Sequence, residues 1–303
     1  MRDIMNPLAL KFQVESMRGT LLAMDFSPTL RLKRLASELR GLREQAGMTT
    51  EQVERHFEWG TGKVSRLENR KAIRPMVQDI RSLLDLYGVT DERVREGLLA
   101  LTRQARERGW WQKYRDVFSG SYVDVETEAS VISNYEPMII PGLLQTREYA
   151  AELRRAGTVG DDASIERFIA GRMERQRILE RANPPHLWVV LDEGALLRPS
   201  LPAEPTRAQM EHLEACAARP NITLQIVPWA AGLHPGVTGS FVILDFPQDP
   251  PIVYLELPED SLYLEESGEV QRYRLKLDSI RTKALDARES VARIRDLAEQ
   301  AKG

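Results

Sequence analysis

The chain has 303 residues, 42% hydrophobic and 29% charged, which is typical of a soluble globular protein with room for two domains. No apolar run approaches the ~20 residues that span a bilayer. Residues 1–19 make a poor signal peptide, because their apolar stretch is short and no small-residue cleavage site follows. The single cysteine, Cys216, excludes an internal disulfide framework. We therefore expect a cytoplasmic protein with no membrane segment.

The charges are distributed unevenly along the chain, although the net charge is only −3. Residues 29–115 hold 19 Lys+Arg against 12 Asp+Glu, whereas residues 116–303 hold 20 against 30. This asymmetry indicates a part that binds a polyanion and a part with another task. Residues 1–28 show no strong periodicity, so we expect a poorly ordered extension, and translation could start at Met1 or Met24.

Helical periodicity and capping residues predict five short helices after this extension. They lie at about 29–46, 49–57, 61–68, 75–87 and 91–108. The second and third form a helical hairpin around the turn at 59–62. We expect residues 29–88 to form one helical domain and residues 89–115 a linker helix.

The hairpin has the spacing of a helix–turn–helix. Its first helix starts at a capping box formed by Thr49 and Gln52, and Val53, His56 and Phe57 make its mostly apolar face. In the second helix, Val64 and Leu67 point inward. Small polar and basic side chains occupy the other side, at Thr61, Lys63, Ser65 and Arg66. A major groove accepts such a helix. The alternative is an ordinary helical hairpin with a solvated basic face.

Residues 34–75, RLASELRGLREQAGMTTEQVERHFEWGTGKVSRLENRKAIRP, resemble the Xre-type, lambda-repressor-like helix–turn–helix. The run KVSRLEN, followed by a basic loop and Pro75, is the most specific match. The resemblance implies that base edges are faced by Thr61, Gly62, Lys63 and Arg66. It implies phosphate contacts by Arg43, Thr50, Ser65, Arg70 and Lys71, and an inward, bracing role for Glu68. Gly60 and Gly62 depart from the family, which commonly has polar residues there, so direct base readout is expected to be weaker at that step.

The resemblance extends over about residues 29–298. The matching segments are Gly109-Trp110-Trp111, SNYEPMIIPGLLQTREYA at 133–150, LDEGALLRP at 191–199, QIVPWAAGLHPGVTGSFVILDFPQDPPIVYLE at 225–256 and ALDARES at 284–290. They resemble a large actinobacterial family of Xre-type regulators. That resemblance implies an antitoxin-like transcriptional regulator, often paired with a small protein encoded by a neighbouring gene.

Residues 116–303 read as an α+β domain with a mostly antiparallel sheet. A turn-rich segment at 135–142 precedes the first helix. Expected helices are 145–156, 164–182, 207–218 and one or two within 267–298; expected strands are 187–191, 223–227, 240–245, 252–257 and 261–264.

No motif in this domain predicts catalysis. The four histidines are dispersed and no GxSxG elbow is present, so we expect no enzyme, no metal site and no cofactor. The loop GLHPGVTGS, which contains His234, reads as a wide hairpin loop in preference to an anion cradle. Asp192 and Glu193 read as helix-capping acids. Trp229 follows a strand, so we expect it to line, with His234 and the 230–238 loop, a groove for a partner or ligand.

The sequence therefore predicts a regulator that binds double-stranded DNA as a homodimer, because related domains read paired half-sites. Two alternatives remain open. One is an antitoxin-like protein that acts mainly by holding a small, basic partner protein on its acidic domain. The other is a metabolite-sensing regulator.

Overall fold

The structure is a computed structural model that forms two compact units, Met1–Gln112 and Lys113–Gly303. It describes residues 28–69, 75–106, 110–114, 117, 122–157, 161–197, 202–247, 249–257 and 261–300. The predicted N-terminal extension therefore lies outside the described residues, apart from Pro28. Each unit is considered by itself below.

The described part of the N-terminal unit is helical, as predicted. Its helices are α2 (Pro28–Gln45), α3 (Thr50–His56), α4 (Lys63–Glu68), α5 (Val77–Leu86) and α6 (Glu92–Gln104). The capping box is present in both directions, because Thr49 accepts from the backbone N–H of Gln52 and the Gln52 side chain accepts from that of Thr49. Asp91 caps α6 from one side only, by accepting from the backbone N–H groups of Arg93 and Val94.

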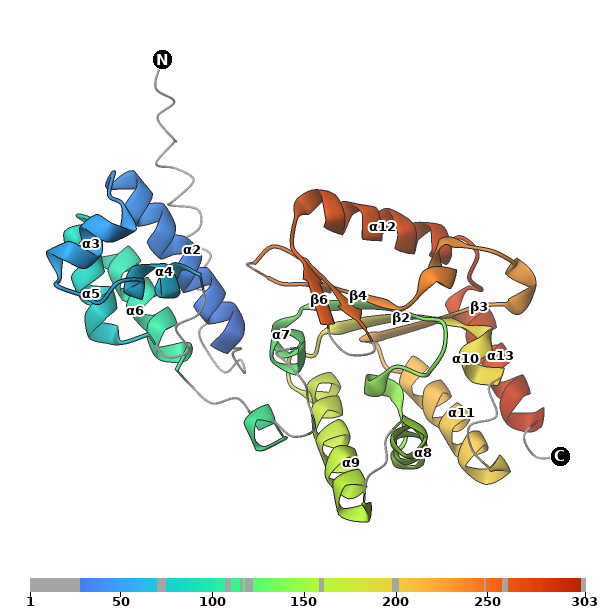
Figure 1. The fold of residues 1–303 in the computed structure, drawn as a ribbon. Helices are drawn as coiled ribbons and strands as arrows, with labels where there is room; N and C mark the ends of the chain where they lie inside the picture. Colours follow the sequence, from blue (N-terminus) through green and yellow to red (C-terminus); the bar gives the residue numbers. More distant parts are fainter. Residues whose placement is uncertain are drawn as a thin grey trace. The chain divides into compact units, whose positions relative to one another are not determined.

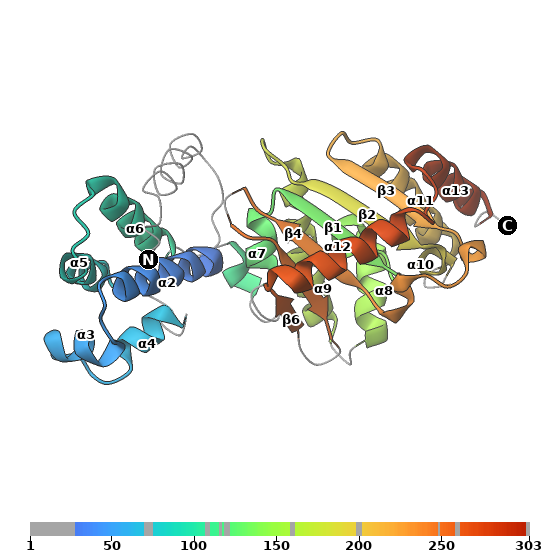
Figure 2. The ribbon, with the colours of Figure 1, turned by 90° about the horizontal axis from the view of Figure 1, so that it is seen from above.

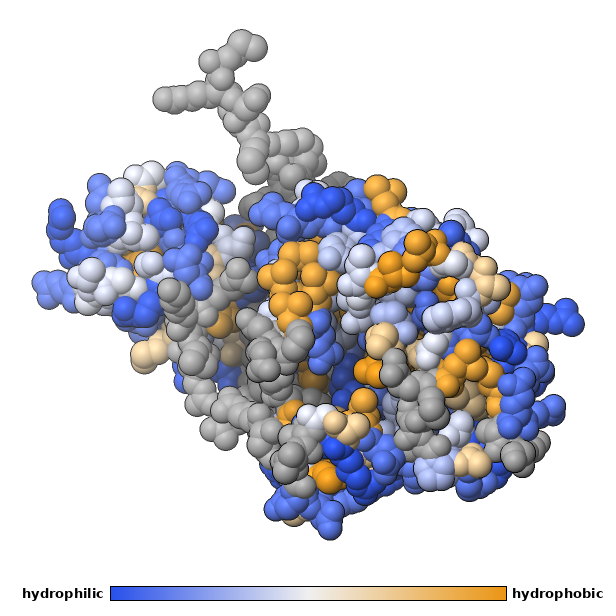
Figure 3. Space-filling view, turned by 45° about the vertical axis from the view of Figure 1, so that its right-hand side comes forward, coloured by the Kyte–Doolittle hydropathy of each residue, from blue (hydrophilic) through white to orange (hydrophobic). Residues whose placement is uncertain are grey.

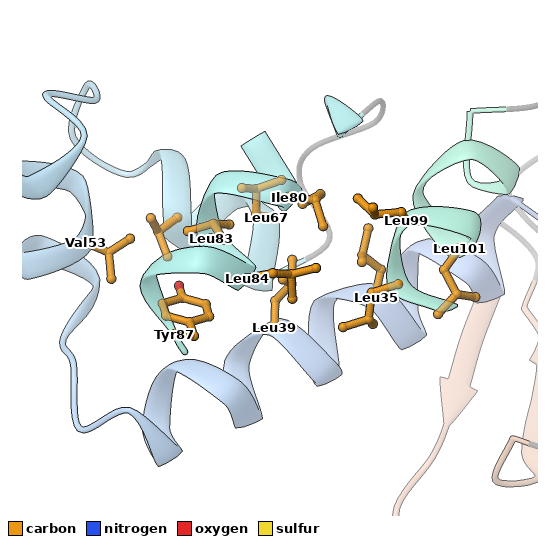
Figure 4. Packing of buried hydrophobic residues seen from close by; sticks show 12 residues of the cluster. Leu35, Leu39, Val53, Leu67, Ile80, Leu83, Leu84, Tyr87, Leu99 and Leu101 are labelled. Carbon is orange, nitrogen blue, oxygen red and sulfur yellow. The ribbon is translucent and has the colours of Figure 1, made fainter. Parts of the chain in front are cut away.

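All five helices contribute to one hydrophobic core, shown in Figure 4. Its buried side chains are Leu35, Leu39, Val53, Val64, Leu67, Ile80, Leu83, Leu84, Tyr87, Leu98, Leu99 and Leu101. The last three belong to α6, which packs against α2 and α5. Helix α6, which lies in the segment predicted to be a linker helix (89–115), is therefore part of this core. Helix α6 buries a leucine face that a solvated linker would leave in water.

The C-terminal unit is α+β, as predicted. Its helices are α7 (Tyr122–Glu128), α8 (Arg147–Gly157), α9 (Asp162–Gln176), α10 (Glu193–Leu197), α11 (Ala203–Ala217), α12 (Ser267–Arg281) and α13 (Ala287–Gln300). Its strands are β1 (Val131–Glu136), β2 (His186–Asp192), β3 (Ile222–Val227), β4 (Phe241–Asp245), β5 (Ile252–Glu256) and β6 (Ser261–Leu264). Helix α7 was not predicted, and the segment 267–298 forms two helices.

The six strands form one sheet in the order β3-β2-β1-β4-β5-β6. The pairs β1–β4, β4–β5 and β5–β6 are antiparallel, so the sheet is mostly antiparallel. The pairs β1–β2 and β2–β3 are parallel, with Val131 opposite His186 and Leu187 opposite Ile222. The helices α8 to α11 make the crossovers that parallel strands need.

Strand β1 corrects the sequence analysis, which placed a turn at Tyr135 and Glu136. It lies at the centre of the sheet between β2 and β4. Its residues Ser133 and Asn134 are polar although they are buried, and this hides the apolar pattern by which a central strand is recognised.

Helices cover both faces of the sheet (Figures 1 and 2). On one face, α12 packs over Tyr135, Phe241 and Val253 through Val270 and Leu277. On the other lie α8, α9 and α11, together with the short helix η2 (Gly142–Leu144). None of the helices in the described ranges is long and apolar enough to cross a membrane.

Candidate nucleic-acid interface

Helix α4 has one buried and one exposed side. Val64, Leu67 and Glu68 are buried, whereas Arg66 is exposed. The helix begins at Lys63, two residues later than predicted. Thr61, also exposed, lies in the turn that precedes it. The α4 face that remains open therefore presents basic and hydroxyl groups, the donors that read base edges and phosphates.

The start of α4 is held by Glu54, a buried carboxylate on α3. Its Oε2 accepts from the backbone N–H of Gly62 at 3.0 Å and its Oε1 from that of Val64 at 2.9 Å. Gly62 has φ +84°, a left-handed conformation that disfavours any side chain. A polar side chain at this cap position is not needed, because Glu54 on the neighbouring helix supplies the cap.

Glu68 braces α4 against α2, as the resemblance implied. Arg43 donates from Nε and Nη2 to its two carboxylate oxygens, at 2.7 and 2.8 Å, and from Nη1 to the Met48 carbonyl. The hydrogen bond to Glu68 raises the pKa of Arg43. Only 12% of the Arg43 side chain is exposed. Arg43, predicted to contact phosphate, has its guanidinium committed to the interior of the bundle.

Lys63, predicted to read bases, is engaged in the free protein. Its Nζ lies 2.8 Å from Asp79 Oδ2 and 3.8 Å from the centroid of the Trp59 ring. Trp59 in turn stacks on Phe57. The ammonium group of Lys63 is therefore already paired with a carboxylate on α5.

The remaining predicted residues surround α4. Ser65 is half-buried and accepts from the Asn69 side chain, and Thr50 is half-buried at the first residue of α3. Arg66 donates from Nη1 to the Thr61 carbonyl at 3.4 Å. Arg70 and Lys71 lie outside the described residues.

Sequence reasoning missed several residues of this interface and misplaced one. His56, predicted on the inward face of α3, is exposed, and Glu54 is buried in its place. Asn69 and Arg40 were also missed; Arg40 donates to Asn69 Oδ1 at 2.7 Å and to the Glu68 carbonyl. Nothing in the sequence around Glu54 indicates its capping role, because its partners are backbone groups eight and ten residues away.

Trp229 and His234, the predicted partner or ligand residues, lie on the β3–β4 connection and differ in their exposure to solvent. Trp229 is 75% exposed, and its neighbours Leu233 and Val237 are 85% and 55% exposed. His234 is buried: its Nδ1 accepts from Gly236 and its Nε2 donates to Asp192. Trp229 is therefore open to solvent, whereas His234 holds the loop in place.

Other side chains fix the same loop. Glu193 Oε2 accepts from the Trp229 backbone N–H at 2.7 Å, and its Oε1 accepts from Arg293. Lys283 donates to the carbonyl of Leu233, and Lys276 to the hydroxyl of Thr238. These hydrogen bonds fix the backbone of the loop that carries the exposed side chains of Trp229, Leu233 and Val237. Figure 3 shows that hydrophobic residues gather in separate patches on the face that it draws.

The described residues bring no three His, Cys, Asp or Glu side chains together in a way that could hold a metal ion. Asp192 is bonded to the Gly194 N–H, as a helix-capping acid would be.

The fold of the described residues 28–69 and 75–106 and the open face of α4 define a helix–turn–helix protein. Comparison with known families agrees: residues 34–97 match the family described as "Helix-turn-helix domain", which supports a DNA-binding regulator. Residues 119–296 match the family described as "Domain of unknown function (DUF5753)". That match covers more than half of the chain, which therefore belongs to the DUF5753 family. No curated protein and no solved structure matches the chain.

Proposed function

We propose that this protein is a sequence-specific transcriptional regulator of the Xre type that docks α4 in the major groove of double-stranded DNA. The observation that carries the proposal is the division of α4 into a braced inner side and an open outer side. Glu54 and Glu68 hold the helix, and Arg66 and Thr61 face outward. A homodimer would place two such helices about one helical turn apart.

The residues in and around α4 divide into those proposed to contact bases and those proposed to contact phosphates. Arg66 would donate to a guanine edge, and Lys63 would do so after leaving Asp79. Thr61 and Gly62 would lie against base edges in the turn. Thr50 and Ser65, with Arg70 and Lys71 by resemblance, would contact phosphates.

The test is fluorescence-anisotropy binding of the full chain to DNA upstream of its own gene and to scrambled DNA, over a series of salt concentrations. We expect preference for the native DNA by a factor of about 10³ or more, with a steep salt dependence. Equal affinity for the two duplexes refutes sequence-specific regulation. Sedimentation of the complex counts the protein copies per site.

A second function is favoured by the loop that carries Trp229. An antitoxin-like role, in which the C-terminal unit holds a small protein encoded by a neighbouring gene, would use Trp229, Leu233 and Val237 as its anchor. Large apolar side chains presented from a held backbone are typical of binding hot spots, in which tryptophan is enriched.

This role is tested with the purified product of the neighbouring gene. Trp229→Ala should weaken the complex by at least tenfold, as expected for a hot spot. Leu275→Ala is the matched control, because Leu275 is also exposed (60%) but lies on α12 outside the loop. Unchanged affinity of a folded Trp229→Ala variant contradicts the role.

A further inference from the structure

The connection between β3 and β4 holds three large apolar side chains in solvent, because its inward positions are already filled. This loop, residues 228–240, packs on the sheet through His234 and Gly236, which are both buried. A Cβ on Gly236 would clash with the Tyr135 ring, so the bare backbone of the loop rests on that side chain. The exposed side of the loop carries Trp229, Leu233 and Val237.

Hydrogen bonds keep these apolar side chains from turning inward. The backbone N–H of Trp229 donates to Glu193 Oε2 at 2.7 Å, and His234 Nε2 lies 3.1 Å from Asp192 Oδ2. An inward turn of the loop would displace His234 and break these bonds. A surface with exposed apolar groups on a fixed backbone loses little conformational entropy when a partner covers it, so the loop is suited to binding.

The loop has no formal charge of its own, because residues 228–240 contain no Lys, Arg, Asp or Glu. Two carboxylates bond to it from β2 and α10, those of Asp192 and Glu193, and only 17% and 7% of their side chains are exposed. Asp192 accepts from His234, and Glu193 accepts from Arg293. Both carboxylates therefore direct their oxygens at protein donors and contribute little to the open surface.

Two lysines bring positive charge to the loop. Lys276 on α12 donates from Nζ to the Thr238 hydroxyl at 2.8 Å, and Lys283, which follows α12, donates to the Leu233 carbonyl at 3.0 Å. Both hydrogen bonds are exposed. Within the described part of the chain, the acceptors of both ammonium groups are neutral oxygens, so no bonded carboxylate offsets their charge. The loop therefore presents apolar side chains and positive charge together.

This local charge is opposite to that of the surrounding unit. Residues 116–303 hold 20 Lys+Arg against 30 Asp+Glu, so a partner attracted by the unit as a whole would be basic. At the loop, Lys276 and Lys283 would repel such a partner. A partner that covers Trp229 has to match two ammonium groups, and carboxylates do so best.

We propose that the loop binds an acidic protein partner, whose surface has an apolar recess for Trp229 and carboxylates opposite Lys276 and Lys283. This assignment rests on the second function proposed above and adds the chemistry of the partner. It differs from the basic partner that the charge of the sequence predicts.

The experiment measures how fast the full chain associates with the purified product of the neighbouring gene over a series of salt concentrations. The double variant Lys276→Gln, Lys283→Gln keeps a hydrogen-bond donor at each position and removes both charges. At low salt it should associate about tenfold more slowly than the parent protein. The two rates should converge at high salt, because salt screens the attraction that the lysines provide.

Two further double variants serve as controls. Lys276→Arg with Lys283→Arg keeps both charges and should associate at the parent rate. Arg155→Gln with Arg177→Gln removes two charges from side chains that are 52% and 72% exposed elsewhere in the unit, and should also associate at the parent rate. Lys283→Gln alone, with an expected effect of about threefold, serves if the double glutamine variant does not fold.

The outcomes distinguish the charge of the partner from the existence of a partner. Equal or faster association of the double glutamine variant, in a complex that Trp229→Ala weakens, overturns the acidic partner and retains the partner-binding role. Absence of a complex, or a complex that Trp229→Ala leaves unchanged, refutes both. Binding of the parent protein to vesicles of equal parts phosphatidylserine and phosphatidylcholine, lost in Trp229→Ala, would assign the loop to an anionic lipid surface and overturn the proposal.

Discussion

Glu54→Gln weakens the contacts that hold the start of α4 and leaves unchanged the side chains that are proposed to contact DNA. The substitution keeps the shape of the side chain and one acceptor oxygen. It replaces the other oxygen by an NH₂ group that must face the N–H of Gly62 or Val64, 3.0 and 2.9 Å from the present carboxylate oxygens. One backbone donor therefore loses its partner inside the protein, because Glu54 is buried.

The expected cost follows from these contacts. A hydrogen bond to a charged group contributes about 1.5–3 kcal/mol, and the charge at a helix N-terminus adds about 0.3–1 kcal/mol. The sum, about 2–4 kcal/mol, corresponds to a fall of about 10–30 °C in the melting temperature of a domain of this size. Because the loss is centred on the turn before α4, DNA affinity should fall with it.

The assay is calorimetry of the full chain, combined with NMR hydrogen exchange at the amides of Gly62 and Val64. We expect faster exchange at these two amides than in the parent protein. Glu51→Gln is the control, because Glu51 lies on the same helix and is exposed. The reasoning is refuted if Glu54→Gln and Glu51→Gln have equal melting temperatures and equal amide protection.

Three further substitutions test the remaining contacts. Arg66→Ala should cost about 1–3 kcal/mol in binding to the specific duplex and far less in binding to random DNA, as measured by fluorescence anisotropy. Arg93→Ala, which removes an exposed charge from α6, is the control. Equal losses on both duplexes would contradict the assignment of Arg66 to base readout. Asp79→Asn should release Lys63 and tighten DNA binding up to about fivefold, the scale of a partly exposed ion pair, and unchanged or weaker binding contradicts this. Glu136 keeps its proton in the folded state up to a pKa of about 8 and loses it near 4.5 when unfolded, so its stabilising effect is complete below about pH 4.5 and is lost as the pH rises through 8. Urea unfolding should show Glu136→Gln to be less sensitive to pH over this range, by at most about 5 kcal/mol, and parallel pH curves would contradict the raised pKa.

The helices of the N-terminal unit could be predicted because their signals are local. The capping box at Thr49 and Gln52 and the apolar spacing of Val64 and Leu67 lie within single helices. The apolar stripe of α6 is also visible in the sequence, but the sequence does not say against which core it packs.

The missed features of the site all depend on distant contacts. Glu54 and Asp79 look like ordinary surface acids, and only the turn and α4 make them partners of Gly62 and Lys63. Central strand β1 was missed because its buried Asn134 looks like a turn residue. Sequence periodicity cannot predict these pairings, because it reports only on residues that are close along the chain.

The sequence by itself determined the class of this protein: a basic helix–turn–helix segment joined to an acidic α+β region, because charge and periodicity are properties of neighbouring residues. The tertiary structure alone decided which charges remain available. Arg43 is committed to Glu68 and Lys63 to Asp79, whereas Arg66 and Trp229 stay exposed. The physical reason is that a charged or aromatic side chain has the same formula wherever it stands, and burial with a partner decides whether it stabilises the fold or meets a ligand.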